Sequence, residues 1–159
     1  MMLSEELYPQ RVFYYFEQIA AIPHGSRNTK AISDFLVNFA KEHNLVWYQD
    51  ENNNVVIVKE ASAGYEAAEP IIIQGHMDMV CEKEKGVDID FEKDGLKLYI
   101  DGDFLKAEGT TLGGDDGIAV AYALALLDSQ EIAHPKLEVV ITVDEEIGML
   151  GAEAIDLSM

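Results

Sequence analysis

Residues 70–78 read Pro-Ile-Ile-Ile-Gln-Gly-His-Met-Asp and join a short apolar run to a histidine and an aspartate. The three isoleucines are β-branched and follow a proline, so they predict a buried strand rather than a helix. Side chains two residues apart on a strand point the same way, so we expect His76 and Asp78 to emerge together at the strand's C-terminal end. An imidazole beside a carboxylate in such a place is typical of a metal ligand with an orienting or bridging partner.

Two later clusters of carboxylates also stand at the ends of apolar patterns. Gly113-Gly114-Asp115-Asp116-Gly117 precedes an Ala- and Leu-rich stretch, and Asp144-Glu145-Glu146-Ile147-Gly148 follows a second β-branched run. The clusters are separated by roughly 30 to 40 residues, about one strand–helix unit. This spacing predicts that they converge on one edge of a sheet, where open α/β sheets bind their ligands. Together the three clusters favour a hydrolytic metal site.

The composition predicts one globular domain with a substantial core. The chain has 159 residues, of which 48% are hydrophobic, and a formal net charge of −19. Such a charge argues against nucleic acid and anionic membrane surfaces as partners, because both would repel the protein. The chain has no basic, apolar leader at its start and no stretch of the roughly 20 apolar residues that a bilayer span needs. A single cysteine fits a reducing compartment, so we expect a cytoplasmic protein.

Hydrophobic periodicity predicts an α/β domain built on a mixed β-sheet flanked by helices. Some of the strands are expected to be buried on both faces, and one pair of strands forms a hairpin across an Asp-Gly turn. Helices are predicted over residues 9–22, 29–42, 115–128 and 148–157, and strands over 45–49, 54–59, 70–74, 96–100, 104–107 and 137–143.

The clusters offer the groups that metal-assisted hydrolysis requires. Two metal ions about 3.5–4 Å apart activate a water molecule and polarise a carbonyl, and a carboxylate must accept the proton of that water. Asp115 is the natural candidate to span two metals. Glu145 and Glu146 are adjacent and face different directions, so that one can bind metal while the other reaches the water. Imidazole and carboxylate ligands suit zinc, with manganese or cobalt as substitutes, and argue against calcium.

Each cluster also has a purely structural interpretation. A lone histidine such as His76 is more often a hydrogen-bonded structural residue than a ligand. Asp115 or Asp116 can cap the helix that follows, a common use of aspartate after glycine. Glu145 and Glu146 can be a solvated exit from a strand. Metal binding is favoured because the three clusters share one setting, each beside glycine and an apolar strand or helix.

The remaining possible ligands are expected to play no part in the chemistry. Cys81 has no second cysteine and no Cys/His spacing beside it, which predicts a partly buried thiol. His24 lies in a turn that ends a helix, and we expect it to be structural. His43 and His134 lie in polar connections and are expected to face solvent.

The same motifs resemble those of a known family, the M20-type di-zinc metallopeptidases. The resemblance is greatest to their cytosolic aminoacyl-histidine (Xaa-His) dipeptidases. It rests on motifs that keep the family's order and cover nearly the whole chain: Ile22-Pro23-His24, Gln74-Gly75-His76-Met77-Asp78-Met79-Val80, Lys106-Ala107-Glu108-Gly109-Thr110-Thr111-Leu112-Gly113-Gly114-Asp115-Asp116-Gly117-Ile118 and Glu145-Glu146-Ile147-Gly148-Met149-Leu150-Gly151-Ala152. The Gly-Thr-Thr-Leu-Gly run is fairly specific to this subgroup.

The resemblance implies a role for each candidate residue. His76 would bind one zinc ion, Asp115 would bridge two, and Glu146 would bind the other. Glu145 would act as the general base, and Asp78 would orient the imidazole of His76. The substrate would be a short peptide, hydrolysed by water. One departure is an aspartate at position 116, where the family leads us to expect asparagine.

The family comparison also implies what this chain lacks. Members of the family are several hundred residues long and take two further metal ligands, an aspartate and a histidine, from later positions. We therefore expect residues 1–159 to be the N-terminal portion of the catalytic domain, without the lid or dimerisation domain and inactive alone, and the complete protein to be a homodimer. Two alternatives stay open: a related co-catalytic aminopeptidase or tripeptidase, and a non-catalytic α/β binding module.

Overall fold

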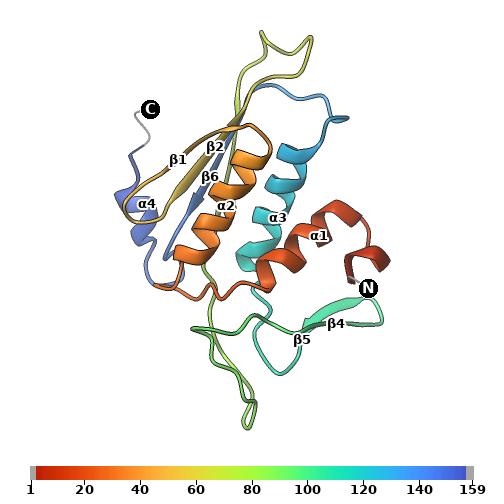
Figure 1. The fold of residues 1–159 in the computed structure, drawn as a ribbon, viewed down its shortest axis with the longest axis vertical. Coiled ribbons are helices and arrows are strands. Elements are labelled where there is room, and N and C mark those ends of the chain that lie inside the picture. The colour runs from red at the N-terminus through yellow and green to blue at the C-terminus, as the bar shows by residue number, and fades with distance from the viewer. Residues whose placement is uncertain (1–2, 157–159) are drawn as a thin grey trace.

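The computed structural model of the chain describes residues 3–156 and shows a sheet of four strands with helices packed on it (Figure 1). The elements, in chain order, are a short 3-10 helix (Leu3–Glu6), α1 (Gln10–Ala20), α2 (Lys30–Glu42), β1 (Val46–Gln49), β2 (Val55–Lys59), β3 (Ile71–His76), β4 (Leu98–Asp101), β5 (Phe104–Ala107), α3 (Gly114–Asp128), β6 (Leu137–Thr142) and α4 (Leu150–Ala154).

The four-stranded sheet is mixed, as the sequence predicts. Its strand order is β1-β2-β6-β3, with β1–β2 and β2–β6 antiparallel and β3–β6 parallel. In the parallel pair, Ile71 lies opposite Leu137 and His76 lies opposite Thr142. The carboxyl ends of β3 and β6 therefore finish side by side. The predicted hairpin is also present, as the separate pair β4–β5.

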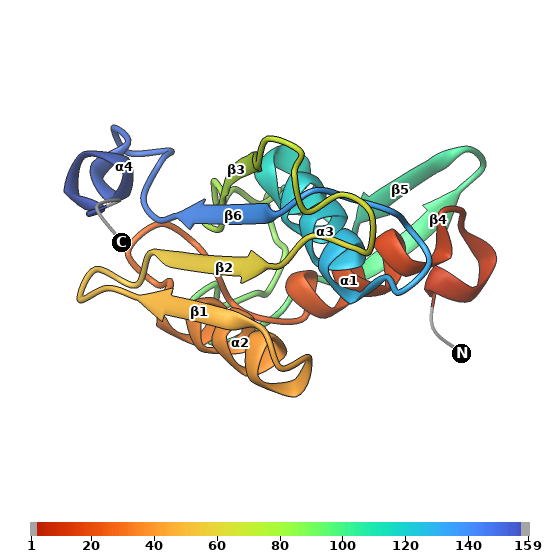
Figure 2. The ribbon, with the colours of Figure 1, turned by 90° about the horizontal axis from the view of Figure 1, so that it is seen from above.

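The core lies between one face of the sheet and the helices. Figure 2 shows α1, α2 and α3 gathered on the same side of the strands, with α1 against α3. Alternate residues of the two central strands point toward them, because successive side chains of a strand face opposite ways. Ile57 of β2 and Val139 and Ile141 of β6 are at most 1% exposed, beside Ile32 and Leu36 of α2. This packing fixes β6, whose end carries one of the carboxylate clusters.

The prediction that residues 70–74 form a buried strand is wrong for the first half of β3. Ile71 is 48% exposed and Ile72 is 65% exposed. Ile72 points to the face of the sheet that the described helices leave uncovered, where it lies near Val58 and Val140. Ile71 points the opposite way, but it begins β3, which is an edge strand within residues 3–156, and so it also meets solvent. Burial begins at Gly75 and continues through Met79. The functional end of the strand is thus its buried end.

The last predicted helix is shorter in the structure than expected. The helix expected over residues 148–157 is the short α4, because Gly148 has φ +118° and Met149 has φ +57°, values that no α-helix accepts. Its expected end at residue 157 lies outside the described residues. None of the helices within residues 3–156 combines the length and the apolarity that a bilayer span requires.

The expectation that His43 and His134 face solvent is wrong. His134 is buried, at 8% exposed, and its Nδ1 lies 2.7 Å from the carbonyl oxygen of Pro135. His43 is half-buried, with Nδ1 2.9 Å from the Phe39 carbonyl oxygen and Nε2 2.9 Å from Asp128 Oδ1. The His43 ring reaches the carboxylate of Asp128, 85 positions away, and the His134 N–H donates to the hydroxyl of Ser62, 72 positions away; local polarity does not reveal such tertiary contacts.

Candidate metal centre

The three clusters identified in the sequence meet at one end of the sheet. His76 closes β3, the glutamates follow β6, and Asp115 stands at the start of α3, whose N-terminal end lies in the lower half of Figure 1 with these strand ends. The parallel pairing of β3 and β6 brings the first and third clusters together. The second cluster, at the start of α3, is brought to the same place by contacts between α3 and β3. The predicted convergence is therefore observed.

His76 is oriented so that one ring nitrogen contacts the main chain and the other faces side chains. Its Nδ1 lies 3.0 Å from the main-chain oxygen of Asp78 and 3.5 Å from Asp78 Oδ1. Both atoms accept hydrogen bonds, so Nδ1 carries a proton. Nε2 then points away from β3, 3.1 Å from Asp115 Oδ1 and 3.7 Å from Glu145 Oε2. This is the arrangement in which a histidine binds metal through Nε2 while its other nitrogen is held by a partner.

Asp78 joins the two strand ends through its buried carboxylate. The side chain is 1% exposed. Its Oδ1 accepts a hydrogen bond from the main-chain N–H of Glu145 at 3.0 Å, and Oδ2 accepts from that of Glu146 at 3.4 Å. The Ser26 hydroxyl donates to Oδ2 at 2.7 Å. Burial alone raises the pKa of Asp78, but its hydrogen bonds, from His76 first and then Ser26 and the two amides, lower it to about 2.

Three side chains present donor atoms suited to a cation. The ligand atoms of His76, Asp115 and Glu146 all lie within 4.8 Å of one another. Two ligands of one tetrahedral Zn²⁺ stand roughly 3.3 Å apart when each bond is about 2.0 Å, and the His76–Asp115 separation of 3.1 Å agrees with this. Asp115 is 87% exposed at its side chain, and Glu146 is half-buried. One imidazole and two carboxylates fit a divalent metal by donor chemistry and by spacing.

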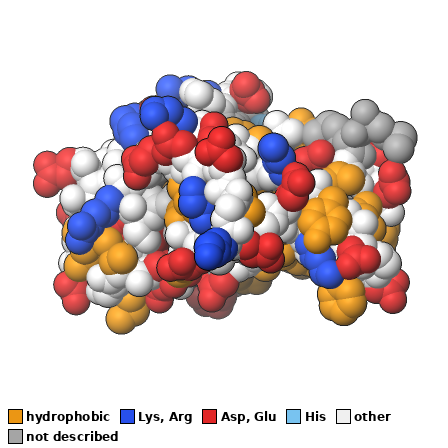
Figure 3. All heavy atoms as spheres, turned by 90° about the horizontal axis from the view of Figure 1, so that it is seen from below, with side chains coloured by type: hydrophobic (Ala, Val, Ile, Leu, Met, Phe, Trp, Pro, Cys, Tyr) orange, Lys and Arg blue, Asp and Glu red, His pale blue; other side chains and the backbone are white. Residues whose placement is uncertain are grey.

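The charge around these donors is negative, which favours a cation. Burial raises the pKa of Glu146, and the carboxylates of Asp115, Glu145 and Asp78 raise it further, while His76 lowers it. Burial lowers the pKa of His76, but Asp78 and Asp115 outweigh it and raise the value to about 9. A cation among these groups would replace a proton and relieve the repulsion between carboxylates. Figure 3 shows acidic side chains spread over the underside of the molecule, with basic ones between them.

Gly75 gives Asp116 room to approach β3. A Cβ on Gly75 would lie 2.7 Å from Asp116 Oδ2, too close for a stable contact. Asp116 Oδ2 accepts a hydrogen bond from the main-chain N–H of His76 at 3.3 Å. Burial raises the pKa of Asp116, although the His76 amide works against this. The aspartate found in place of the expected asparagine thus holds the start of α3 against β3.

Sequence reasoning missed two residues that support the site. Ser26 lies 52 positions before Asp78, in a turn interpreted as structural, so nothing in the local pattern pairs them. Asn54 is 1% exposed, accepts a hydrogen bond from the Val143 N–H at 3.0 Å and donates to the Gly151 carbonyl at 3.1 Å. It thereby holds the segment that carries the glutamates. His24 is buried, with Nδ1 2.5 Å from the Ile22 carbonyl oxygen, and its structural role stays a prediction.

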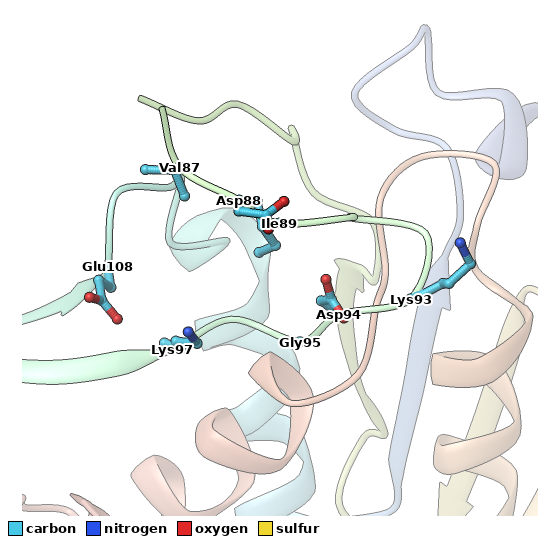
Figure 4. A pocket seen from close by; sticks show the side chains of 8 residues that line it. All are labelled: Val87, Asp88, Ile89, Lys93, Asp94, Gly95, Lys97 and Glu108. Carbon is cyan, nitrogen blue, oxygen red and sulfur yellow. The ribbon is translucent and has the colours of Figure 1, made fainter. Parts of the chain in front are cut away.

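A cavity of about 660 Å³ lies apart from these donors. It opens between the segment before β4 and the end of β5, and none of the three donor residues lines it (Figure 4). Its lining mixes acidic, basic and apolar residues, namely Val87, Asp88, Ile89, Lys93, Asp94, Gly95, Lys97 and Glu108. The cavity is therefore separate from the candidate metal centre.

The chain is similar to known peptidases over most of its length. The chain is 42% identical over 147 residues to the cytosol non-specific dipeptidase of Escherichia coli K12, covering 92% of this chain and 30% of the relative. It matches the crystal structure of aminoacylhistidine dipeptidase from Vibrio alginolyticus with a TM-score of 0.94 and 39% identity, over 98% of this chain and 32% of that one. The chain thus spans about a third of the length of these relatives.

More distant structures share the fold. A tripeptidase from Staphylococcus aureus matches with a TM-score of 0.74 and 24% identity, over 92% of this chain and 39% of that one. The sequence profile described as "Peptidase family M20/M25/M40" matches residues 72–156, a span that begins in β3 and includes all three donor residues. With the mixed sheet, the convergent clusters and this match, the chain belongs to peptidase family M20/M25/M40.

Proposed function

We propose that the complete protein containing this chain is a metal-dependent dipeptidase. The observation that carries the proposal is the cluster of His76 Nε2, Asp115 and Glu146 donor atoms within 4.8 Å, at the strand ends of an M20-family fold. The names of two relatives, a non-specific dipeptidase and an aminoacylhistidine dipeptidase, support dipeptides as the substrate class.

In the proposed mechanism each residue has one task. His76 would hold one divalent cation and Glu146 a second, and the exposed Asp115 would be shared by both. When bound, such a pair supplies Lewis acidity toward a peptide carbonyl and a water molecule of lowered pKa. Glu145, whose Oε2 lies 3.7 Å from His76 Nε2, would accept a proton from the attacking water and donate it to the leaving amine. Asp78 keeps the His76 ring turned toward the cation.

The donor set favours zinc as the resident metal. One imidazole and two carboxylates form an N/O site of the kind that zinc takes in hydrolases, and Mn²⁺ or Co²⁺ can replace it. The metal content of the purified complete protein tests this directly. Full occupancy with zinc, or activity restored to the metal-free protein by Zn²⁺, Mn²⁺ or Co²⁺, supports the assignment. A pure, folded protein that binds none of them refutes it and favours a non-catalytic module.

The substrate is tested with matched peptides. We propose that the protein cleaves Xaa-His dipeptides among others, since one relative is named for aminoacyl-histidine and the other as non-specific. The complete protein would be assayed on Ala-His, Ala-Leu and Ala-Ala-His with and without a chelator. Cleavage of both dipeptides only with metal present supports the proposal. Cleavage of the tripeptide alone favours the tripeptidase or aminopeptidase alternative.

We also propose that residues 1–159 form part of a larger catalytic domain. The support is that the chain covers 30% and 32% of the two relatives named above. A polypeptide of these residues alone is then expected to bind zinc weakly and to show no turnover, and two tight zinc sites by calorimetry would contradict this. A homodimer for the complete protein and a cytosolic location, the latter supported by the name of the E. coli relative, belong to the same proposal.

A further inference from the structure

The loop over residues 24–27, between α1 and α2, contacts both strand ends of the metal centre. The Met79 N–H donates to the His24 carbonyl at 3.1 Å, and Gly25 forms a parallel bridge with Met79. On the other side, the Arg27 N–H donates to Asp144 Oδ1 at 2.6 Å. The loop therefore ties the segment after β3 to the segment after β6.

Ser26 lies at the centre of this loop and reaches the one carboxylate shared by both strand ends. Its hydroxyl donates to Asp78 Oδ2 at 2.7 Å, which is shorter than the contacts of Asp78 with the Glu145 and Glu146 amides and with His76 Nδ1. Asp78 is 1% exposed, so water does not replace a lost donor easily. The rotation of the Asp78 carboxylate about its terminal bond is thus set partly by Ser26.

We propose that Ser26 is a positioning residue for metal binding, acting through Asp78. This inference rests on the proposed function. The hydroxyl holds Oδ2, which leaves Oδ1 directed at His76 Nδ1 and the Glu145 amide. Loss of the hydroxyl frees the carboxylate to turn, so the His76 ring loses part of its orientation toward the cation. Groups that orient metal ligands in this way change metal affinity although they touch no metal.

The surrounding contacts allow the hydroxyl to be removed without removing the loop. The bridge between Gly25 and Met79 and the hydrogen bond from the Arg27 N–H use backbone donors, which a substitution of Ser26 leaves in place. Ser26 itself is half-buried, so there is space for a slightly larger side chain. Threonine and valine have the same shape and differ in the hydroxyl alone, which gives a size-matched pair.

The experiment compares the complete wild-type protein with Ser26→Ala, Ser26→Thr and Ser26→Val. The Zn²⁺ dissociation constant is measured by competition with a chromophoric chelator, and the visible spectrum of the Co²⁺-loaded protein reports ligand geometry. Ser33→Ala is the control, because Ser33 is a fully buried serine whose hydroxyl donates to the Asn53 carbonyl at 2.7 Å, apart from the donor residues. Thermal unfolding of every metal-free variant measures stability separately.

Ser26→Ala and Ser26→Val are expected to weaken Zn²⁺ binding about tenfold and to alter the Co²⁺ spectrum, whereas Ser26→Thr stays within about threefold of wild type. Ser33→Ala is expected to lower the Tm and leave both metal readouts unchanged. Equal affinities and spectra for the threonine and valine variants would overturn the proposal, even if the alanine variant does not fold. A Ser33→Ala protein that shows the same metal defect would also overturn it. Wild-type protein that binds neither metal would refute the proposed function itself, a result distinct from both.

Discussion

The two sides of the metal centre are built in different ways. On the β3 side, His76 and Asp78 are buried and each polar atom has a partner within the fold. On the exposed side, the side chains of Asp115 at the start of α3 and Glu145 after β6 are 87% and 39% exposed, and Asp115 Oδ1 lies 3.1 Å from His76 Nε2. The β3 side is organised by the protein, while the exposed side is free to adapt to a cation and a substrate. The free energy of unfolding should therefore depend mainly on the β3 side, and turnover mainly on the exposed side.

The largest expected effect tests the chemical role of the exposed side. Glu145→Gln in the complete protein is expected to lower kcat by about 10²–10⁴-fold, because the amide cannot accept the proton of the attacking water. Zinc content should not change, since the proposed ligands are other residues. Steady-state kinetics and metal analysis measure both, with Glu153→Gln on α4 as an exposed control. Turnover at the wild-type rate would remove Glu145 from the mechanism.

A second pair of variants tests where stability resides. Asp78→Ala is expected to lower the free energy of unfolding of the metal-free protein by about 3 kcal/mol, because the Ser26 hydroxyl and the Glu145 and Glu146 amides lose a buried acceptor. Asp115→Ala should cost less than about 1 kcal/mol, since its ion pair with His76 is exposed at Asp115.

Urea unfolding in the presence of a chelator measures both values, and zinc titration then separates stability from binding. Both variants should lose zinc affinity, for different reasons: Asp115→Ala removes a ligand, and Asp78→Ala releases the ring of another. Equal losses of stability would contradict the contrast between the two sides.

The same contrast explains what the sequence could predict. The mixed sheet and the convergence of the three clusters followed from periodicity and spacing, because strand ends and helix starts are local features. The individual roles of Glu145, Glu146 and Asp78 came from family resemblance and stay predictions. Ser26 and Asn54 were missed because their partners lie 52 and 89 positions away. The exposure of Ile71 and Ile72 was missed because an apolar run says neither which face of a sheet is covered nor that its strand lies at an edge.

A third prediction tests the contact between the start of α3 and β3. It compares two glycines, Gly75 and Gly114, each of which precedes a proposed ligand. Gly75→Ala is expected to lower the free energy of unfolding by about 2 kcal/mol, because its Cβ would lie 2.7 Å from Asp116 Oδ2 and force it from β3. Gly114→Ala meets only a Leu112 methyl at 3.9 Å and should change stability by less than about 0.5 kcal/mol. Chemical unfolding of the two variants without metal measures both changes. A Gly75→Ala protein as stable as wild type would mean that Asp116 can move away from β3 without cost.

The smallest expected effect concerns a carboxylate away from the metal centre. It tests how much an anchored carboxylate contributes to the free energy of unfolding when it binds no metal. Asp128 accepts hydrogen bonds from Arg11 and His43, which tie α3 to α1 and α2. Burial raises the pKa of Asp128, but these partners, Arg11 first, bring it below its usual 3.8. A lowered pKa means that the anchored carboxylate stabilises the fold above pH 3.8, and that this contribution disappears as the pH falls toward the folded-state value.

Asp128→Asn should therefore cost about 1 kcal/mol at pH 7, with a difference from wild type that shrinks below pH 4. The difference in free energy of unfolding between Asp128→Asn and wild type, measured from pH 7 to pH 3, should be the same with and without metal, because Asp128 is not one of the proposed ligands. Asp115→Asn provides the comparison: its effect on stability should be small under a chelator and should grow when zinc is added. A metal-dependent effect at Asp128 would mean that the helices transmit strain to the site, and the division between an anchored framework and an adaptable metal side would have to be abandoned.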